Sequence, residues 1–301
     1  QCCQYLWQFA HWQLFGSNLL CTIYLIYFYE NSQMRHSAMS AAITMRTILF
    51  LIISDYRECG LEASPHVLHQ SPWLVYLEYH MDGQFVDIRC AGTLVSSRHV
   101  LTAAHCKFVF PSLFTTVPAR LGEYNVTTSV DCVDGLCADS HMSVEIEHIK
   151  VHSQSRGIEN DIAVLTLTTP APYTDFIRPI CLPSKTDLET NKTTLTAAGW
   201  GEIQPGIYSE IKKHINLTYR ETQVCNNVYK SITIPDSIIC AGGQLDLDTC
   251  RGDSGGPLVL RRGKAELWGI TNAGNPQCGA EGYPGIYTRV GDFIKWMSDY
   301  L

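Results

Sequence analysis

The sequence lacks the features that would indicate a nucleic-acid-binding or zinc-binding protein. Basic residues are scarce: 22 lysines and arginines stand against 29 acidic residues, for a net charge of -7. No long run of like charge occurs, whereas a nucleic-acid-binding domain is expected to present a basic face. Cysteine and histidine residues do not show the spacing of a zinc site. Composition therefore argues against a nucleic-acid partner and indicates no metal.

Long hydrophobic runs are also missing. The apolar stretch Leu19–Tyr29 has only about half the length that spans a bilayer. A second run, Ile48–Ile53, follows Met45 and a basic residue, a pattern typical of a shortened signal peptide. We interpret residues 1–58 as a leader or an anomalous segment outside the fold, with the true leader starting at Met45. A membrane anchor at Leu19–Tyr29 is the alternative.

Helical periodicity is rare in the remainder of the chain. Short segments rich in β-forming residues alternate with glycine-containing turns, which is typical of strands. The clearest are Trp73–Tyr79, Gly92–Val95 and Ile162–Leu167. Many short strands without intervening helices indicate a sandwich or barrels. Only the segment Asp292–Tyr300 predicts an amphipathic helix, with one apolar face formed by Phe293, Trp296, Met297 and Tyr300.

Cysteine, by contrast, is abundant. Of 13 cysteines, ten lie at or after Cys59. An even number in a secreted segment indicates disulfide bonds, and reduced buried thiols are the alternative. Three Asn-x-Thr glycosylation sequences, at Asn125, Asn191 and Asn216, support an oxidising compartment, although each is a weak signal by itself. We expect a secreted, extracellular protein.

Three short motifs carry the chemistry. The run Asp248–Pro257 (DTCRGDSGGP) places Ser254 among glycines, which let the backbone amides approach a substrate. The upstream runs TAAHC and NDIAVL contain His105 and Asp161. A serine hydroxyl is a weak nucleophile until a base takes its proton, and the base works best when a carboxylate orients it. The chain order His, Asp, Ser is one of three common orders for this geometry.

These motifs make residues 72–301 resemble the trypsin-like serine proteases of the chymotrypsin family. The resemblance implies an all-β fold of two antiparallel six-stranded β-barrels, with the active site between them and a C-terminal helix. The boundary between the barrels is expected near residues 170–185. His105 and Asp161 would then lie in the first barrel and Ser254 in the second. Residues 59–71 are interpreted as a linker before this protease domain.

The resemblance also implies a role for each residue. Ser254 would be the nucleophile, His105 its base, and Asp161 the carboxylate that orients the imidazole. The backbone N–H groups of Gly252 and Ser254 would form the oxyanion hole. The ordinary alternatives are a surface or core histidine, a turn or cap aspartate, and a glycine-rich turn.

The resemblance also predicts substrate specificity, from the position of Asp248 relative to Ser254. Asp248, six residues before Ser254, matches the base of the family's primary pocket, where a carboxylate selects Arg or Lys through a charge-assisted hydrogen bond. A solvated loop charge is the alternative. Gly274 and Gly285 match the pocket-wall glycines. The run Asn272–Gly274 replaces the family's Ser-Trp-Gly, which removes a flat apolar wall. We expect cleavage of proteins after Arg or Lys, with altered selectivity for the preceding residue.

Disulfide pairs and a possible ion site are implied in the same way. Glu123, in the run RLGEY, is similar to the start of the family's calcium loop, so calcium is an expectation there and no other cofactor is required. The resemblance suggests the pairs Cys90–Cys106, Cys225–Cys240 and Cys250–Cys278, with Cys132–Cys137 as a fourth and Cys59–Cys181 as a fifth.

Activation presents a departure from the family. Such proteases are made as zymogens and cut before an Ile-Val-Gly-Gly-like sequence, and the freed amino group pairs with the aspartate before the serine, here Asp253. Residues 59–71 contain no Arg or Lys. Arg57 is followed by Glu58, whose charge fits poorly in a buried apolar pocket. The activation segment is therefore missing from this sequence, or the protein does not activate in the usual way.

The run RLGEY, the loop with Cys132 and Cys137, and the pair Cys59-Gly60 resemble arthropod clip-domain proteases. These act in extracellular cascades of melanisation, Toll signalling or development, which implies an upstream activating protease and a serpin-type inhibitor as partners. A clip domain itself is not evident, because only three cysteines precede Cys59. A non-catalytic homologue that acts as a binding or regulatory module is the alternative function, and a membrane-tethered protease is a third.

Overall fold

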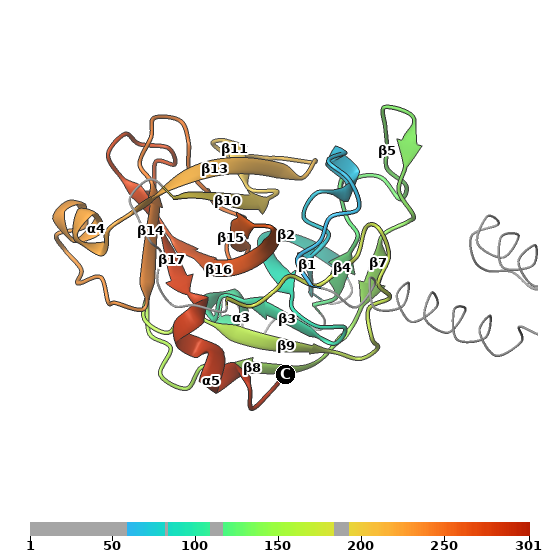
Figure 1. The fold of residues 1–301 in the computed structure, drawn as a ribbon, viewed down its shortest axis with the longest axis horizontal. Helices are drawn as coiled ribbons and strands as arrows, with labels where there is room; N and C mark the ends of the chain where they lie inside the picture. Colours follow the sequence, from blue (N-terminus) through green and yellow to red (C-terminus); the bar gives the residue numbers. More distant parts are fainter. Residues whose placement is uncertain (1–58, 82–83, 109–116, 184–192) are drawn as a thin grey trace, which may run out of the picture. The chain divides into compact units, whose positions relative to one another are not determined.

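The computed structural model describes residues 59–81, 84–108, 117–183 and 193–301 (Figure 1). The interpreted leader, the alternative anchor and the sequence at Asn191 lie outside these residues. Within the described ranges, no helix has the length and apolar character needed to cross a membrane.

The first sheet has seven strands in the order β7-β4-β1-β2-β3-β9-β8, with all neighbours antiparallel. Its strands are β1 (Leu74–Met81), β2 (Gln84–Leu94), β3 (His99–Thr102), β4 (Ala119–Leu121), β7 (Met142–Val144), β8 (Ile146–Val151) and β9 (Ala163–Leu167). Only Glu145 separates β7 from β8, so the two edge strands of the sheet are consecutive in the chain. The sheet is barrel-like, and it has seven strands rather than six because one long edge segment is divided at Glu145.

The second sheet is a closed barrel of six strands in the order β10-β13-β14-β17-β16-β15. Its strands are β10 (Thr194–Gly199), β13 (Lys213–Arg220), β14 (Ile238–Gly242), β15 (Pro257–Arg262), β16 (Lys264–Ala273) and β17 (Pro284–Arg289). Pairing of β10 with β15, Thr196 opposite Val259, closes the ring. Figure 1 shows these strands, in yellow to red, beside those of the first sheet. The predicted all-β fold with two barrels is confirmed.

Smaller elements complete the fold. They are η3 (Val67–His69), α3 (His105–Phe108), β5 (Cys132–Val133), β6 (Leu136–Cys137), β11 (Glu202–Gln204), β12 (Ile207–Tyr208), α4 (Thr222–Val228), η4 (Val290–Phe293) and α5 (Ile294–Met297). The terminal helix is shorter than the predicted Asp292–Tyr300, because the chain enters it through a 3₁₀ turn that contains Gly291. Phe293 and Met297 are buried against the first sheet, as the predicted apolar face requires.

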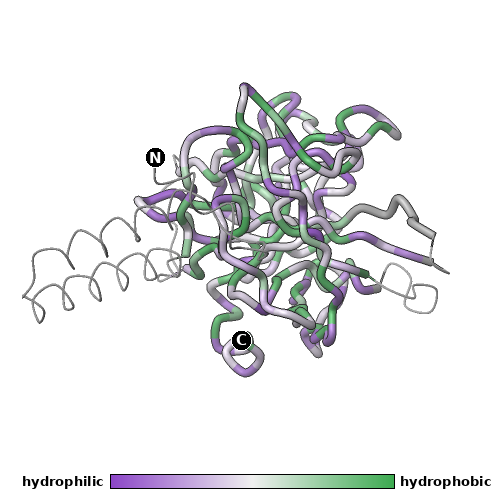
Figure 2. Tube along the Cα trace, turned by 90° about the vertical axis from the view of Figure 1, so that its right-hand side faces the viewer, coloured by the Kyte–Doolittle hydropathy of each residue, from purple (hydrophilic) through white to green (hydrophobic). Residues whose placement is uncertain are grey.

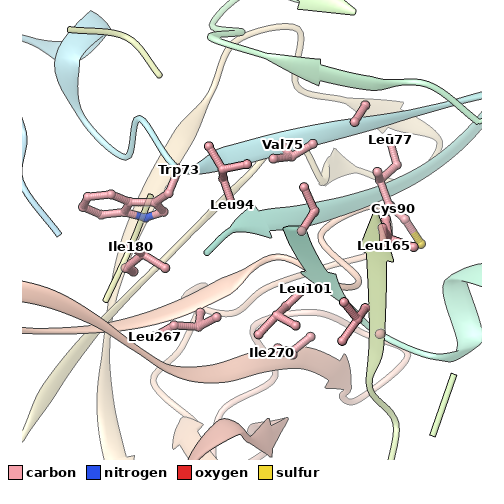
Figure 3. Close-up of a cluster of buried hydrophobic side chains, with 14 of the residues drawn as sticks. Trp73, Val75, Leu77, Cys90, Leu94, Leu101, Leu165, Ile180, Leu267 and Ile270 are labelled. Atoms are coloured by element: carbon pink, nitrogen blue, oxygen red, sulfur yellow. The ribbon is translucent and has the colours of Figure 1, made fainter. Parts of the chain in front are cut away.

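The core joins the two sheets. Figure 2 shows hydrophobic and hydrophilic residues interspersed along the chain, and β14 and β17 are almost continuously buried. The largest cluster contains Val75 and Leu101 of the first sheet together with Leu267 and Ile270 of β16, and Figure 3 shows these side chains converging. Burial of each such side chain contributes about 1.5–3 kcal/mol. The two barrels are therefore packed on a shared apolar layer.

Five disulfides staple this framework, and they are the pairs that the resemblance implies. They are Cys59–Cys181, Cys90–Cys106, Cys132–Cys137, Cys225–Cys240 and Cys250–Cys278. Cys59 also lies beside β16, because Gly60 accepts a hydrogen bond from Ala265 N at 2.9 Å. The start of the described chain is thus attached to the second barrel.

Candidate active site

His105 and Asp161 are brought together by one strand pair. His105 begins α3, three residues after β3 ends at Thr102, and Asp161 lies two residues before β9 begins at Ala163. Thr102 and Ala163 are opposite each other in the β3–β9 ladder. The register of two hydrogen-bonded strands therefore places the two functional side chains at the same end of the sheet.

The Asp161 carboxylate holds His105 through two hydrogen bonds. Oδ2 lies 2.7 Å from His105 Nδ1, and Oδ1 accepts from the His105 backbone N at 2.8 Å. The Asp161 side chain is 1% exposed, whereas the imidazole is 36% exposed. Because a carboxylate only accepts, the contact places the proton on Nδ1 and leaves Nε2 to act as a base. The arrangement suits an imidazole that takes a proton and becomes a cation beside a buried negative charge.

Ser254 enters this region from the second barrel. Its carbonyl accepts a hydrogen bond from Ala91 N of β2 at 2.7 Å. The next residue, Gly255, has φ of +79°, and a Cβ there would overlap Thr102 Oγ1 and Ala91 O. Only glycine permits this approach, which seats the serine turn against the strand end that precedes His105. No hydrogen bond links Ser254 Oγ to His105 among the contacts of the described residues, and such bonds are often long before a substrate is bound.

Two backbone amides in the serine turn are available for an anion. Gly255 N donates to Thr271 O and Asp253 N to Cys250 O, which fixes the turn. The N–H groups of Gly252 and Ser254 donate to no acceptor in the described part of the chain. Ser254 also lines a cleft of about 180 Å³ together with Thr249 and Gly274. Ser254, one of the two predicted oxyanion donors, therefore lies at the edge of a cleft large enough to admit a side chain.

Asp248 lies beside both predicted wall glycines. Its Oδ1 accepts from Thr249 N at 2.8 Å, and its buried Oδ2 has no hydrogen-bond partner among the described residues. A Cβ on Gly274 would lie 3.7 Å from Oδ2, and one on Gly285 would lie 2.7 Å from Oδ1. Burial raises the pKa of Asp248 to about 7. A buried carboxylate with one oxygen that has no hydrogen-bond partner among the described residues, beside two glycines, is suited to receive a cationic side chain.

Comparison with known proteins identifies the family. A family model described as Trypsin matches residues 61–297, which is well over half of the chain. The chain belongs to the trypsin family. This trypsin-family chain is 34% identical to CLIP domain-containing serine protease HP8 of Bombyx mori, over 89% of this chain and 78% of that protein. It is 35% identical to Phenoloxidase-activating factor 3 of Holotrichia diomphalia, over 81% and 75% respectively.

A third relative of this trypsin-family protein is Serine protease ea of Drosophila melanogaster, which is 36% identical over 78% of this chain. The chain spans 65% of that relative. The resemblance to clip-domain proteases, read from short motifs, is thereby confirmed over most of the chain.

Asp253, the predicted partner of a freed amino group, is held by backbone amides instead. Oδ1 accepts from Gly201 N at 2.8 Å and Oδ2 from Cys250 N at 2.9 Å. No cation pairs with it among the described residues, and burial raises its pKa to about 6. Asp253 lines a cavity of about 500 Å³ that Asp248 and Gly199 also line. The carboxylate lies in a space that could admit a further group.

The residues around Glu123 do not fit the calcium ion expected in a trypsin-family loop. Glu123 Oε2 lies 2.6 Å from Arg120 Nη2 and 3.4 Å from His141 Nδ1, and Oε1 accepts from Tyr124 N. Asp131 accepts from Asn125 N and from the Thr128 hydroxyl, and the Asn125 carboxamide oxygen accepts from the following turn. Calcium needs six to eight oxygen ligands, but these oxygens are already engaged by protein donors.

Burial also shifts the pKa values of ionisable groups around Glu123. The carboxylate is fully buried, and this burial raises the pKa of Glu123 to about 7 in spite of Arg120. Lys212, also buried, has a pKa lowered to about 8 by its burial. Sequence reasoning missed Arg120 as the partner of Glu123, although the spacing of three residues within RLGEY was a signal for it.

The two described glycosylation candidates lie in different surroundings. Asn125 is half-buried, and its Oδ1 accepts from Thr127 N at 3.0 Å. Asn216 is exposed on β13, where its Oδ1 accepts from Thr196 Oγ1. Both stay predictions, and the outward position on a strand makes Asn216 the more accessible of the two.

Proposed function

We propose that this chain is a secreted trypsin-like serine endopeptidase that cleaves proteins after Arg or Lys. The observation that carries the proposal is the His105–Asp161 bond, held by paired strands, at the position where Gly255 seats the serine turn. Its use of Arg or Lys is supported by Asp248 Oδ2, which has no partner within the described residues. The chemistry needs only side chains and backbone amides, so we propose no cofactor.

The reaction would proceed in two steps. His105 takes the Ser254 proton as Oγ attacks the scissile carbonyl, and the Gly252 and Ser254 amides stabilise the oxyanion. The imidazolium then gives its proton to the leaving amine, and an acyl-enzyme on Ser254 remains. Water, activated by the same imidazole, releases the acyl group and restores the serine. Asp161 stays ionised throughout and stabilises the imidazolium.

A role in an extracellular proteolytic cascade is supported by the relatives. One relative is named Phenoloxidase-activating factor 3, and another, 36% identical over 78% of this chain, is named Spaetzle-processing enzyme of Drosophila melanogaster. By this likeness we propose a protein substrate, an upstream activating protease and a serpin-type inhibitor as partners.

A non-catalytic homologue is the second candidate. The absence of Arg and Lys from residues 59–71, together with an Asp253 carboxylate held by amides rather than by an ammonium group, favours it. Both observations concern activation, and neither alters the His105–Asp161 pair.

Active-site titration discriminates between the two functions. The purified full-length protein would be treated with a fluorophosphonate, which phosphonylates an activated serine, before and after exposure to a trypsin-like activator. We expect stoichiometric labelling on Ser254, and cleavage of Arg-containing peptides by a parallel sample that has not been labelled. Absence of labelling under both conditions would leave the scaffold function.

A further inference from the structure

The turn that carries Asp161 is held from the second barrel by hydrogen bonds that the proposed reaction does not use. Asn272 Nδ2 donates to Ile158 O and to Thr288 Oγ1, each at 3.0 Å. Thr288 Oγ1 in turn donates to Asp161 O at 2.9 Å. One carboxamide on β16 therefore contacts the first residue of this turn directly and the last through a hydroxyl on β17.

A β-bulge points Asn272 toward this turn. In the pairing of β16 with β17, Thr271 lies opposite Tyr287 and Ala273 lies opposite Ile286, so the residue between them has no opposite partner. A bulge of this kind re-aims a side chain relative to the regular alternation of a strand. Asn272 is 8% exposed and Thr288 is fully buried. The carboxamide is thus directed into the contact between the barrels.

The acceptors require an amide nitrogen at this point. Ile158 O can only accept, and Thr288 gives its single hydroxyl proton to Asp161 O, so it too accepts from Asn272. A carboxamide NH₂ carries two protons and satisfies both acceptors. Serine, which the resemblance places at this position in relatives, has one proton and cannot satisfy both. The Asn272 substitution therefore adds a second anchor to the turn.

The turn needs external support. Asn160, next to Asp161, has φ of +50°, a left-handed conformation that costs asparagine less than most other residues but is still sparsely populated. Such a conformation persists when surrounding contacts over-determine it. Asn272 holds both ends of the segment from Ile158 to Asp161, and the Asp161 carboxylate holds His105 at two points.

We propose that Asn272 is a positioning residue that fixes the Asp161 turn and, through it, the orientation of the His105 imidazole. Its kinetic consequence rests on the proposed protease function, whereas its geometric consequence does not. The residue acts on the base and not on substrate binding. Its loss is therefore expected to lower kcat and to leave KM nearly unchanged.

The test compares three variants of the full chain. Asn272→Asp keeps the shape of the side chain but replaces its donating NH₂ group with an oxygen that can only accept. Asn272→Ser keeps one donor. Thr288→Val keeps the shape of the side chain but removes the hydroxyl that links Asn272 to Asp161 O. The first readout is the ¹H NMR resonance of the His105 Nδ1 proton, assigned by its loss in His105→Ala. Hydrogen bonding to Asp161 moves this resonance downfield, and we expect it to move upfield or broaden in Asn272→Asp and Thr288→Val, with a smaller change in Asn272→Ser.

The second readout is kinetic. It uses unlabelled protein whose concentration of active sites is known from fluorophosphonate titration of a separate aliquot. Displacement of the base by about 1 Å costs up to about 100-fold, so we expect kcat to fall roughly 10- to 100-fold in the two stronger variants, with KM nearly constant. Asn226→Asp is the matched control. It is the same substitution at an exposed position of α4, where Oδ1 continues to accept from Ile234 N.

The outcomes separate the two proposals. A wild-type His105 resonance and wild-type kcat in both Asn272→Asp and Thr288→Val would overturn the positioning role, as would an effect confined to KM. If Ser254 proves unreactive, the protease function fails, but the resonance still decides the role of Asn272. If Asn272→Asp does not fold, by circular dichroism, then Asn272→Ser and Thr288→Val decide.

Discussion

The two barrels contribute to the site in different ways. In the first, the β3–β9 register brings His105 and Asp161 together, and the second barrel adds hydrogen bonds to the turn that carries Asp161. In the second, Ser254 and Asp248 lie on a long loop between β14 and β15, which is fixed by Cys250–Cys278 and by the bonds that Asp253 accepts. Strand pairing thus determines the acid–base half of the site, and loop anchors determine the nucleophile and pocket half.

This difference indicates which part of the site can change activity without disturbing the fold. A loop can change its conformation while the barrel below it remains intact, whereas a paired strand end cannot move without breaking a ladder. The residues tied to activation and specificity, Asp253 and Asp248, are both in the loop half. We therefore expect substitutions there to change activity without changing the His105–Asp161 contact.

The largest expected effect comes from removing the nucleophile alone. Ser254→Ala deletes the attacking oxygen and should lower kcat by a factor on the order of 10⁶, as in other serine hydrolases whose nucleophile is removed. The His105 Nδ1 resonance should stay, because its partners are in the other barrel. Turnover of an Arg peptide and the NMR spectrum measure the two halves separately. Ser231→Ala, at an exposed position, is the control, and retention of peptidase activity in Ser254→Ala would exclude this serine as the nucleophile.

The next effect concerns the pocket. Asp248→Asn keeps the size of the side chain but removes the charge that pairs with Arg or Lys. Loss of a buried charge pair costs about 2–5 kcal/mol, so kcat/KM for Arg peptides should fall about 30- to 5000-fold. Turnover of peptides with Leu or Phe at the same position should be little changed. Equal losses for Arg and Leu peptides would show that Asp248 supports the fold of the loop rather than substrate selection.

A smaller effect follows from protonation of the same carboxyl. Burial raises the pKa of Asp248 to about 7, so in the free pocket the group is largely neutral below that pH and ionised above it. A bound cation requires the ionised form, and the affinity for benzamidinium should therefore decrease about tenfold for each pH unit below 7. Calorimetry between pH 5 and 8 measures this dependence. It should disappear in Asp248→Asn, and a flat profile in the wild type would contradict the assignment.

The smallest effect is expected from calcium, in the first barrel at Glu123. Because Oε2 pairs with Arg120 and Oε1 accepts from the Tyr124 amide, calcium chloride and EDTA should leave the Tm of the wild-type protein unchanged. Arg120→Met should lower the stability by about 3–5 kcal/mol, because it leaves a buried carboxylate unpaired. Thermal unfolding with and without calcium measures both. A saturable rise of the wild-type Tm with calcium would show that the ion displaces these donors.

Local motifs made much of the site predictable. Each of the runs around His105, Asp161 and Ser254 contains its recognisable residues within a few positions. The β1 and β9 strands are predicted by short β-forming segments. The structure brings His105 and Asp161 into contact, and it places Asp248 beside Gly274 and Gly285. The catalytic roles themselves stay predictions, because geometry does not measure turnover.

Contacts between distant residues were not predictable from the sequence. Asn272 and Ile158 are 114 positions apart, and Thr288 and Asp161 are 127 apart, so no local pattern relates them. The division of one strand at Glu145 and the shortened terminal helix were missed for a different reason. Both depend on how backbone hydrogen bonds are distributed at an element's end, which side-chain periodicity does not report.

The Cys59–Cys181 disulfide closes a covalent ring whose two cysteines are 122 positions apart. A single peptide-bond cut anywhere within that ring opens it but releases no fragment. Processing between Cys59 and the first strand would leave the upstream piece attached to the second barrel, and the two chains would separate in electrophoresis only after reduction. The disulfide therefore keeps the segment around Cys59 covalently linked to the C-terminal half of the chain even when the backbone between Cys59 and Cys181 is cut.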